Sequence, residues 1–215
     1  KDEKVYVSYV KKTNECAFLH LDKADFNFKF LKFKNIFKNK ECMNLIQAGR
    51  IQKITEEGQS LILLSTQSHT LEKDDERDYK PQDNNSIYGK ILSINENDKS
   101  FKIFSKGHRN VLGLFADDNV ILATENGPRG GDEINKIIKN KNYGWDLASY
   151  GKKYHLDESY GDHFDLGFEE PIFSFVPSIG ISEIVKIDNN FDSDWKNNYL
   201  IATMASKHLL RIKFN

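Results

Sequence analysis

The residues with the clearest chemical potential lie between positions 107 and 145. His108, Arg109 and Asn110 follow a glycine and precede a short apolar run, so they supply an imidazole, a fixed cation and an amide. Residues 125–132 then form a loop with three Gly, one Pro and an acidic residue at each end. A cation beside an amide suits an anionic ligand. A Gly-rich acidic loop suits calcium, which binds carboxylate and backbone oxygens.

Each pattern also has a structural interpretation. Arg109 can tie neighbouring loops together, and the loop can be a tight turn whose Asp132 and Glu133 are solvated. A second segment, 146–170, is dense in aromatic residues without strand alternation. It either packs over the scaffold as a long loop or forms a wall that stacks on a planar ring or a sugar face.

Short strands separated by turns must position these residues, because the apolar residues alternate with polar ones over short runs. Four such runs end in a small polar residue, at 5–8, 61–66, 120–124 and 199–203. A further strand pattern follows each run, at 17–22, 89–95, 133–139 and 209–214. Another precedes the last three runs, at 49–54, 111–115 and 181–187. The alternation predicts an all-β fold, and the repetition indicates about four similar units.

The motifs resemble those of a known family. The segments GHRN at 107–110, GPRGGDEIN at 127–135 and NYGW at 142–145 are similar, in order and spacing, to those of the soluble quinoprotein sugar dehydrogenases of the glucose/sorbosone dehydrogenase family. The resemblance implies a six-bladed β-propeller, the cofactor pyrroloquinoline quinone (PQQ) held with calcium, and oxidation of aldose sugars. Because the chain begins and ends within a blade unit, we expect a fragment or a shortened member, with residues 1–215 as one partial propeller domain.

The resemblance also implies which residues form the site. Those that match cofactor contacts in the family are Arg109, Asn110 and Tyr154. Those that match its calcium site are Gly127, Pro128, Glu133 and Tyr143, with Asp132 as a further candidate ligand.

The sequence departs from the family pattern in three ways: Ile46 and Ala205 stand at two of its functional positions, and its Arg-rich final blade lies beyond the sequence. Ile46 stands where the family has its catalytic histidine, and isoleucine cannot take a proton. A base for the sugar hydroxyl proton is worth ~10²–10⁴-fold in rate, so we assign no catalytic residue. Two functions stay open. The chain is either a PQQ- and calcium-dependent aldose dehydrogenase, or a non-catalytic propeller that binds calcium, carbohydrate or a protein partner.

The composition bears on which classes of binding partner the protein can have. The chain has 31 basic and 32 acidic residues and a net charge of −1, which gives no overall attraction to nucleic acid. No segment approaches the ~20 apolar residues of a membrane span. Cys16 and Cys42 are either paired in an oxidising compartment or two separate thiols. The resemblance implies a periplasmic or secreted protein that acts on a sugar or another small molecule. Open sheet edges predict self-association.

Overall fold

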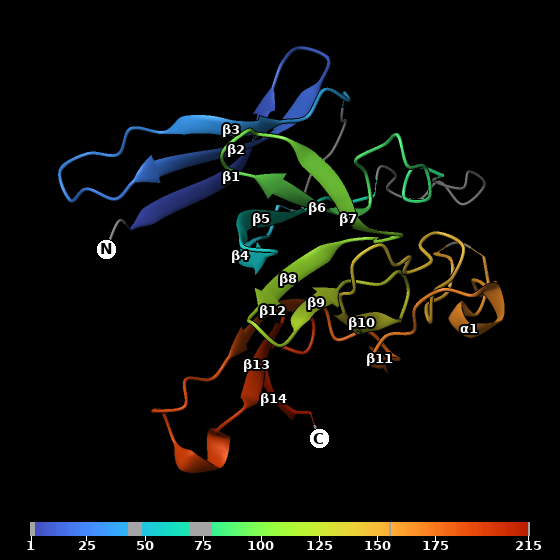
Figure 1. The fold of residues 1–215 in the computed structure, drawn as a ribbon. Coiled ribbons are helices and arrows are strands. Elements are labelled where there is room, and N and C mark those ends of the chain that lie inside the picture. Colours follow the sequence, from blue (N-terminus) through green and yellow to red (C-terminus); the bar gives the residue numbers. More distant parts are fainter. Residues whose placement is uncertain (1–2, 43–48, 69–78, 155, 215) are drawn as a thin grey trace.

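Four antiparallel β-sheets follow one another along the chain (Figure 1). The computed structural model describes residues 3–42, 49–68, 79–154 and 156–214. Each sheet is built from strands that are consecutive in sequence, in the spatial orders β1-β2-β3, β4-β5-β6-β7, β8-β9-β10-β11 and β12-β13-β14. The predicted all-β propeller architecture with four blade units is confirmed.

The strand bounds are as follows. The first sheet contains β1 (Lys4–Lys12), β2 (Ala17–Asp25) and β3 (Lys34–Lys38), and the second contains β4 (Ile51–Glu56), β5 (Gln59–Ser65), β6 (Lys90–Asn95) and β7 (Phe101–Lys106). The third contains β8 (Val111–Ala116), β9 (Ile121–Glu125), β10 (Asp132–Lys136) and β11 (Phe173–Phe175), and the fourth contains β12 (Ile181–Lys186), β13 (Asn198–Thr203) and β14 (Leu209–Lys213). Two short helices, α1 (His163–Leu166) and the 3-10 helix η1 (Ser193–Trp195), lie in loops.

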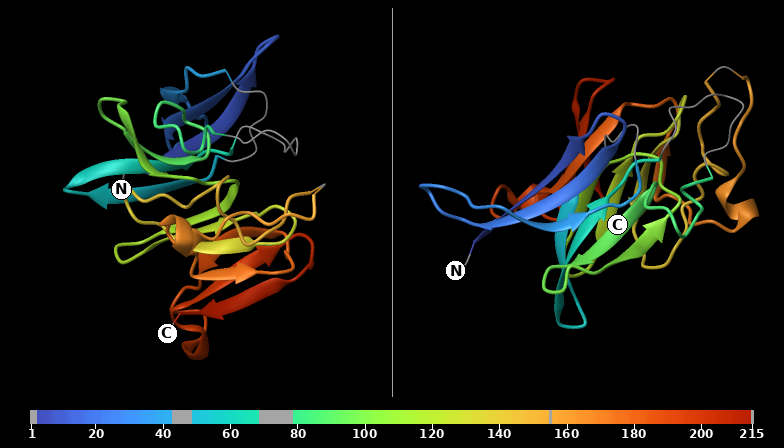
Figure 2. Two further views of the ribbon diagram at one scale, coloured as in Figure 1. Left: turned by 90° about the vertical axis from the view of Figure 1, so that its right-hand side faces the viewer. Right: turned by 90° about the horizontal axis from the view of Figure 1, so that it is seen from above.

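The first strands of the second, third and fourth sheets lie side by side, and the sheets fan out from them (Figure 2). The amide of Gln52 in β4 donates to the carbonyl oxygen of Leu114 in β8 at 2.8 Å, and β8 in turn contacts β12. This is the arrangement of propeller blades, whose innermost strands line the centre. The strands predicted at 49–54, 111–115 and 181–187 take this inner place.

The apolar core lies between sheets. One cluster of buried side chains, around Leu92, joins the first and second sheets. A second, around Leu114, joins the second and third sheets, and a third, around Ile201, joins the third and fourth. Since strand side chains alternate between faces, the second and third sheets each pack against a neighbour on both faces. The fold is therefore stabilised blade against blade.

Polar contacts reinforce the first two blades. The carboxylate of Glu96 accepts hydrogen bonds from the Tyr6 hydroxyl at 2.6 Å and the Ser60 hydroxyl at 2.9 Å, and it lies 3.1 Å from Lys23 Nζ. These donors come from both sheets. Cys16 and Cys42 form a disulfide that links the start of β2 to the segment after β3.

The sequence patterns predict two strands of the first sheet and three strands of each later sheet, and they miss the last strand of the first three sheets. The missed strands are β3, β7 and β11. Phe101 and Lys102 of β7 are exposed, and β3 buries only Ile36 and Phe37. An edge strand packs one short face, so its apolar signal is too weak to separate it from a loop.

Two long loops gather at one end of the sheets (Figure 1). The segment 146–170 forms no named strand and contains only α1, which Asp162 caps at its N-terminus. Beside it lie residues 79–89, which precede β6. Within the described residues, no helix has the length and apolarity needed to cross a membrane.

Candidate functional site

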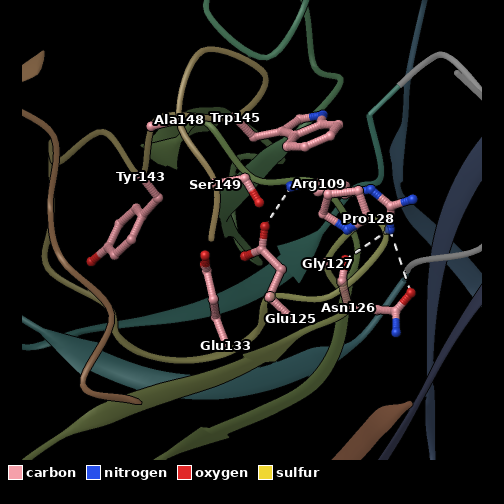
Figure 3. Close-up of a pocket in the computed structure, with 11 residues that line it drawn as sticks. Arg109, Glu125, Asn126, Gly127, Pro128, Glu133, Tyr143, Trp145, Ala148 and Ser149 are labelled. Carbon is pink, nitrogen blue, oxygen red and sulfur yellow. Dashed lines mark hydrogen bonds between the residues drawn. The ribbon is translucent and has the colours of Figure 1, made fainter. Parts of the chain in front are cut away.

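Two carboxylates face each other on the third sheet. Glu125 ends β9, Glu133 is the second residue of β10, and the two are directly opposed in the ladder. Directly opposed residues share a face of the sheet. Both side chains therefore project toward the same small cavity (Figure 3). The volume open to a water-sized sphere is about 10 Å³, which is about the space of one water molecule or one ion.

Close backbone packing shapes one wall of this cavity. Gly127, Pro128 and Gly131, from the loop between β9 and β10, line it. Gly131 has φ +70°, and a Cβ there would collide with the backbone nitrogen of Gly151. A Cβ on Gly151 would lie 2.6 Å from the Gly130 carbonyl oxygen. The glycines of the sequence motif therefore allow two loops to touch through their backbones.

Asp132 anchors this loop to the fourth sheet. Its Oδ1 accepts hydrogen bonds from the Asn126 amide, the Gly127 backbone N–H and the Ser178 hydroxyl, at 3.1, 3.0 and 2.9 Å. Its Oδ2 accepts from the backbone N–H groups of Ile179 and Ile181, at 3.0 and 2.9 Å. Both oxygens are thus engaged by the protein. We interpret Asp132 as a structural residue, in contrast to the candidate ligand role expected from its position.

Glu133 is held in an environment that disfavours its charge. Burial, together with the nearby Glu125 carboxylate, raises the pKa of Glu133 to about 8. The amide of Asn135 donates to Glu133 Oε2 at 3.2 Å and offsets part of this effect. Two like charges opposed on a buried face destabilise the fold. A proton or a cation would relieve this repulsion.

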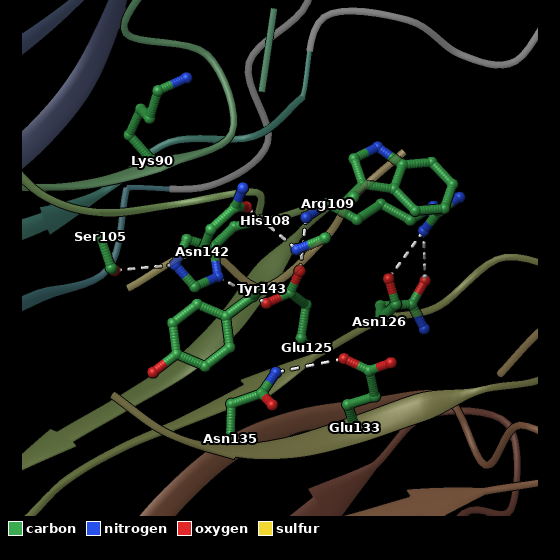
Figure 4. A network of polar contacts seen from close by, with 12 residues as sticks. Lys90, Ser105, His108, Arg109, Glu125, Asn126, Glu133, Asn135, Asn142 and Tyr143 are labelled. Atoms are coloured by element: carbon green, nitrogen blue, oxygen red, sulfur yellow. Dashed lines mark hydrogen bonds and ion pairs between the residues drawn. The ribbon is translucent and has the colours of Figure 1, made fainter. Parts of the chain in front are cut away.

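A buried chain of hydrogen bonds fixes Glu125 (Figure 4). Ser105 Oγ lies 2.8 Å from His108 Nε2, and His108 Nδ1 lies 3.0 Å from Glu125 Oε2. The backbone N–H of Arg109 donates to the other oxygen, Glu125 Oε1. The side chains of Ser105, His108 and Glu125 are all buried. A substrate therefore cannot reach Ser105 or His108. Their arrangement orients Glu125 toward the cavity.

Side chains from the 142–170 region complete the surroundings. The ring of Tyr143 lines the cavity and stacks on His108 with centroids 4.7 Å apart, while its hydroxyl donates to the Lys136 carbonyl oxygen at 2.6 Å. His163 Nε2 lies 3.9 Å from Glu133 Oε1. Burial lowers the pKa of His163, which favours the neutral ring. Its neighbour Tyr150 stacks on it with centroids 5.3 Å apart.

Arg109 brings a cation to the rim of the cavity. Its guanidinium lies over the Trp145 ring, 5.3 Å from the centroid, and Nη1 donates to the Asn126 carbonyl oxygen at 2.8 Å. Two buried polar atoms, Asn110 Oδ1 and Trp145 Nε1, make no hydrogen bond to any described residue. Buried polar groups normally have partners, so these atoms are among the few exceptions in the described part of the chain.

Most of the predicted site residues come together. Those that line the cavity are Arg109, Gly127, Pro128, Glu133 and Tyr143. Asn110 and Tyr154 do not line it, and the Tyr154 side chain is exposed, so their cofactor roles stay predictions. Ile46 lies outside the described residues.

Sequence reasoning missed Glu125, Trp145 and His163. Trp145 ends the NYGW motif, and His163 gave no signal in its loop. The eight-residue spacing between Glu125 and Glu133 around a Gly-rich turn was the usable signal, because a hairpin of that length can oppose its two ends.

The arrangement suits a hard cation. Among the residues that the structure describes, no three His, Cys, Asp or Glu side chains group into a metal cluster. A cation between Glu125 and Glu133 would therefore take its other ligands from backbone carbonyls and water, as calcium commonly does. The donor set and the ion-sized cavity fit calcium. The Arg109 guanidinium over the Trp145 ring fits an anionic planar cofactor.

Comparison with known proteins gives consistent matches. A sequence model of the family described as Glucose / Sorbosone dehydrogenase matches residues 1–215. Aldose sugar dehydrogenase YliI of Escherichia coli (strain K12) is 32% identical over 127 residues, which cover 57% of this chain and 34% of that protein. The chain thus spans about a third of the length of the curated relatives it matches.

Two solved structures are similar in fold. The soluble aldose sugar dehydrogenase from Escherichia coli in its apo form superimposes with a TM-score of 0.83 at 21% identity, over 100% of this chain and 66% of that one. The PQQ-bound form of aldose sugar dehydrogenase from Streptomyces coelicolor gives a TM-score of 0.68 at 22% identity, over 100% of this chain and 59% of that one.

Proposed function

Because the chain belongs to the glucose/sorbosone dehydrogenase family, we propose that it takes part in sugar oxidation with PQQ and calcium. The observation that carries the proposal is the buried Glu125–Glu133 pair in an ion-sized cavity, with Arg109 at its rim. An aldose sugar is the proposed substrate, because the Escherichia coli relative YliI is an aldose sugar dehydrogenase.

Each element of the cavity has a defined part in this proposal. Glu125 and Glu133 hold calcium, helped by backbone oxygens of the loop that contains Gly127 and Pro128. Arg109 and Asn110 bind the anionic cofactor, since a guanidinium pairs with carboxylates in a planar fork. Trp145 supports the guanidinium, which lies over its ring. PQQ, when bound, supplies the two-electron acceptor for the sugar.

The alternative is a propeller that binds calcium or carbohydrate and catalyses nothing. Ile46 favours this alternative, because it stands where the family has its proton acceptor. Loss of a general base costs ~10²–10⁴-fold in rate. We therefore expect the chain on its own to show low turnover or none, and Ile46→His to raise turnover if PQQ binds.

Reconstitution separates the two functions. The purified chain is mixed with calcium and PQQ, binding is followed by the absorbance change of PQQ, and turnover by sugar-dependent dye reduction. Arg109→Ala is expected to weaken PQQ binding at least tenfold. The matched control is Arg211→Ala, because Arg211 lies over the Trp195 ring, 4.4 Å from its centroid, in the fourth sheet. Equal PQQ binding by wild type and Arg109→Ala contradicts the assigned role. PQQ binding without turnover in both wild type and Ile46→His supports the non-catalytic alternative.

The compartment and the assembly state belong to the same proposal. The Cys16–Cys42 disulfide favours an oxidising compartment, which supports a periplasmic or secreted location. The fourth sheet exposes Val185 and Leu209, at 49% and 65% of their surface. Exposed apolar side chains on an outer blade support self-association.

A further inference from the structure

A strongly apolar and basic loop joins β2 to β3. Five large apolar side chains fall within eight positions, and all are exposed: Phe26 at 41%, Phe28 at 95%, Phe30 at 68%, Leu31 at 39% and Phe33 at 40%. We name residues 26–34 the aromatic–lysine loop. Exposed apolar residues usually occur singly. So many in one loop mark a surface that binds a partner.

The charge of this segment is one-sided. Between Phe26 and Lys40 the sequence has five lysines, Lys29, Lys32, Lys34, Lys38 and Lys40, and no acidic residue. The whole chain has a net charge of −1. The positive charge is therefore local, and it alternates with the exposed aromatic rings.

The loop projects from the rest of the molecule. In Figures 1 and 2 it is the light-blue segment that extends away from the first sheet, at the end opposite to the 146–170 loop. The backbone N–H of Phe26 donates to the Glu3 carbonyl oxygen at 2.8 Å, and the Phe26 and Phe28 rings pack edge to face at 4.8 Å. The Cys16–Cys42 disulfide closes the opposite end of the β2–β3 pair. The strands β2 and β3 are thus held at both ends, and the loop between them is exposed to solvent.

We propose that the aromatic–lysine loop docks the protein onto an anionic lipid surface. Aromatic and leucine side chains enter the boundary between headgroups and acyl chains. Lysines keep their ammonium groups at the level of anionic headgroups while their stems lie along apolar surface. The alternation of the two residue types in this loop meets both requirements. The inference stands apart from the sugar chemistry at the other end of the sheets.

Two other occupants fit less well. Single-stranded nucleic acid stacks its bases on open aromatic faces, whereas Phe26 and Phe28 pack against each other with planes 75° apart. A symmetric second copy would bring the same lysines face to face, and like charges would repel. An anionic membrane surface satisfies both the rings and the lysines.

Vesicle sedimentation tests the proposal on the 215-residue chain. Vesicles of phosphatidylcholine alone are compared with vesicles that also contain phosphatidylglycerol, at low and high salt. We expect at least tenfold stronger partitioning to the anionic vesicles, and high salt should weaken it. Phe28→Ser with Phe30→Ser should reduce binding at least tenfold, and so should Lys29→Glu with Lys32→Glu.

The matched control changes equally exposed rings elsewhere. Phe164 and Phe191 are 80% and 70% exposed in other loops, and Phe164→Ser with Phe191→Ser should bind like wild type. Circular dichroism and thiol titration verify the fold and the disulfide in every variant. Four results overturn the proposal: no binding, equal binding to both vesicle types, equal loss in the control, or binding to single-stranded RNA but not to vesicles.

Discussion

Replacing Glu133 by glutamine should stabilise the protein in the absence of calcium, even though it removes a site residue. The pKa of Glu133 is raised from 4.5 to about 8, first by burial and then by Glu125. The folded state therefore holds this proton more tightly than the unfolded state does. Stability contributed by the proton is fully present below about pH 4.5 and is lost as the pH rises toward about 8.

The magnitude follows from the shift. At about 1.4 kcal/mol per pKa unit, the raised pKa of Glu133 lowers the free energy of unfolding by about 3 kcal/mol at pH 7 and by about 5 kcal/mol above pH 8. Glutamine is neutral in both states and keeps an oxygen that can accept from Asn135, so it avoids this cost. For a chain of this size, about 3 kcal/mol corresponds to roughly 6–12 °C in melting temperature.

Urea denaturation at pH 7 and pH 4.5, in EDTA and in calcium, measures the effect. In EDTA, Glu133→Gln should be more stable than wild type by about 3 kcal/mol at pH 7 and equal to it at pH 4.5. In calcium, wild type should gain stability by mass action, about 2.7 kcal/mol at 100 times Kd, and the variant should gain little.

Glu158→Gln is the control, because Glu158 is an exposed carboxylate paired with Lys153. It should change stability by less than about 0.5 kcal/mol at either pH. The reasoning is refuted if Glu133→Gln is less stable than wild type at pH 7 in EDTA. A stabilisation of equal size at both pH values refutes it too, because it would have no link to the proton.

The remaining predictions concern stability and assembly. Reducing the Cys16–Cys42 disulfide, which spans 26 residues, should cost about 3–4 kcal/mol in urea denaturation; an unchanged midpoint contradicts this. Gly131→Ala should cost at least about 2 kcal/mol and abolish calcium stabilisation, since its Cβ meets the Gly151 backbone. Gly58→Ala is the control, because Gly58 has φ +76° in open space, and its calcium response should stay intact. Light scattering should show self-association at micromolar concentration, and a compact monomer with one cooperative melt would disprove it.

Much of the fold could be predicted from the sequence, because propeller blades repeat the same pattern of strands. The second strands β5 and β9 are largely buried, so the runs 61–66 and 120–124 carry strong apolar signals. The outer strand β11 has three residues, and no local pattern marks so short an element. Its pairing depends on β10, which lies about forty residues earlier in the chain.

The site was predictable only in part. The motif located Gly127, Pro128, Glu133 and Tyr143, but the alternative of a solvated turn could not be dismissed from composition. Burial decides that question, because Glu133 is only 8% exposed. The placement of His163 beside Glu133 arises from the course of a long loop, and loop paths depend on contacts across the whole scaffold.

The adjacent residues Asp132 and Glu133 point to opposite faces of β10, one to the fourth sheet and the other to the cavity. Strand side chains alternate with a period of two residues. The role of each carboxylate therefore depends on whether its position faces the fourth sheet or the cavity. Removing one glycine from the 127–131 loop would shift β10 by one step and exchange the two roles. The anchoring hydrogen bonds would then point into the cavity, and the buried acid would point into the seam between blades. The length of this loop is therefore as much a determinant of the site as the residues themselves, and natural variants should alter it only in even steps.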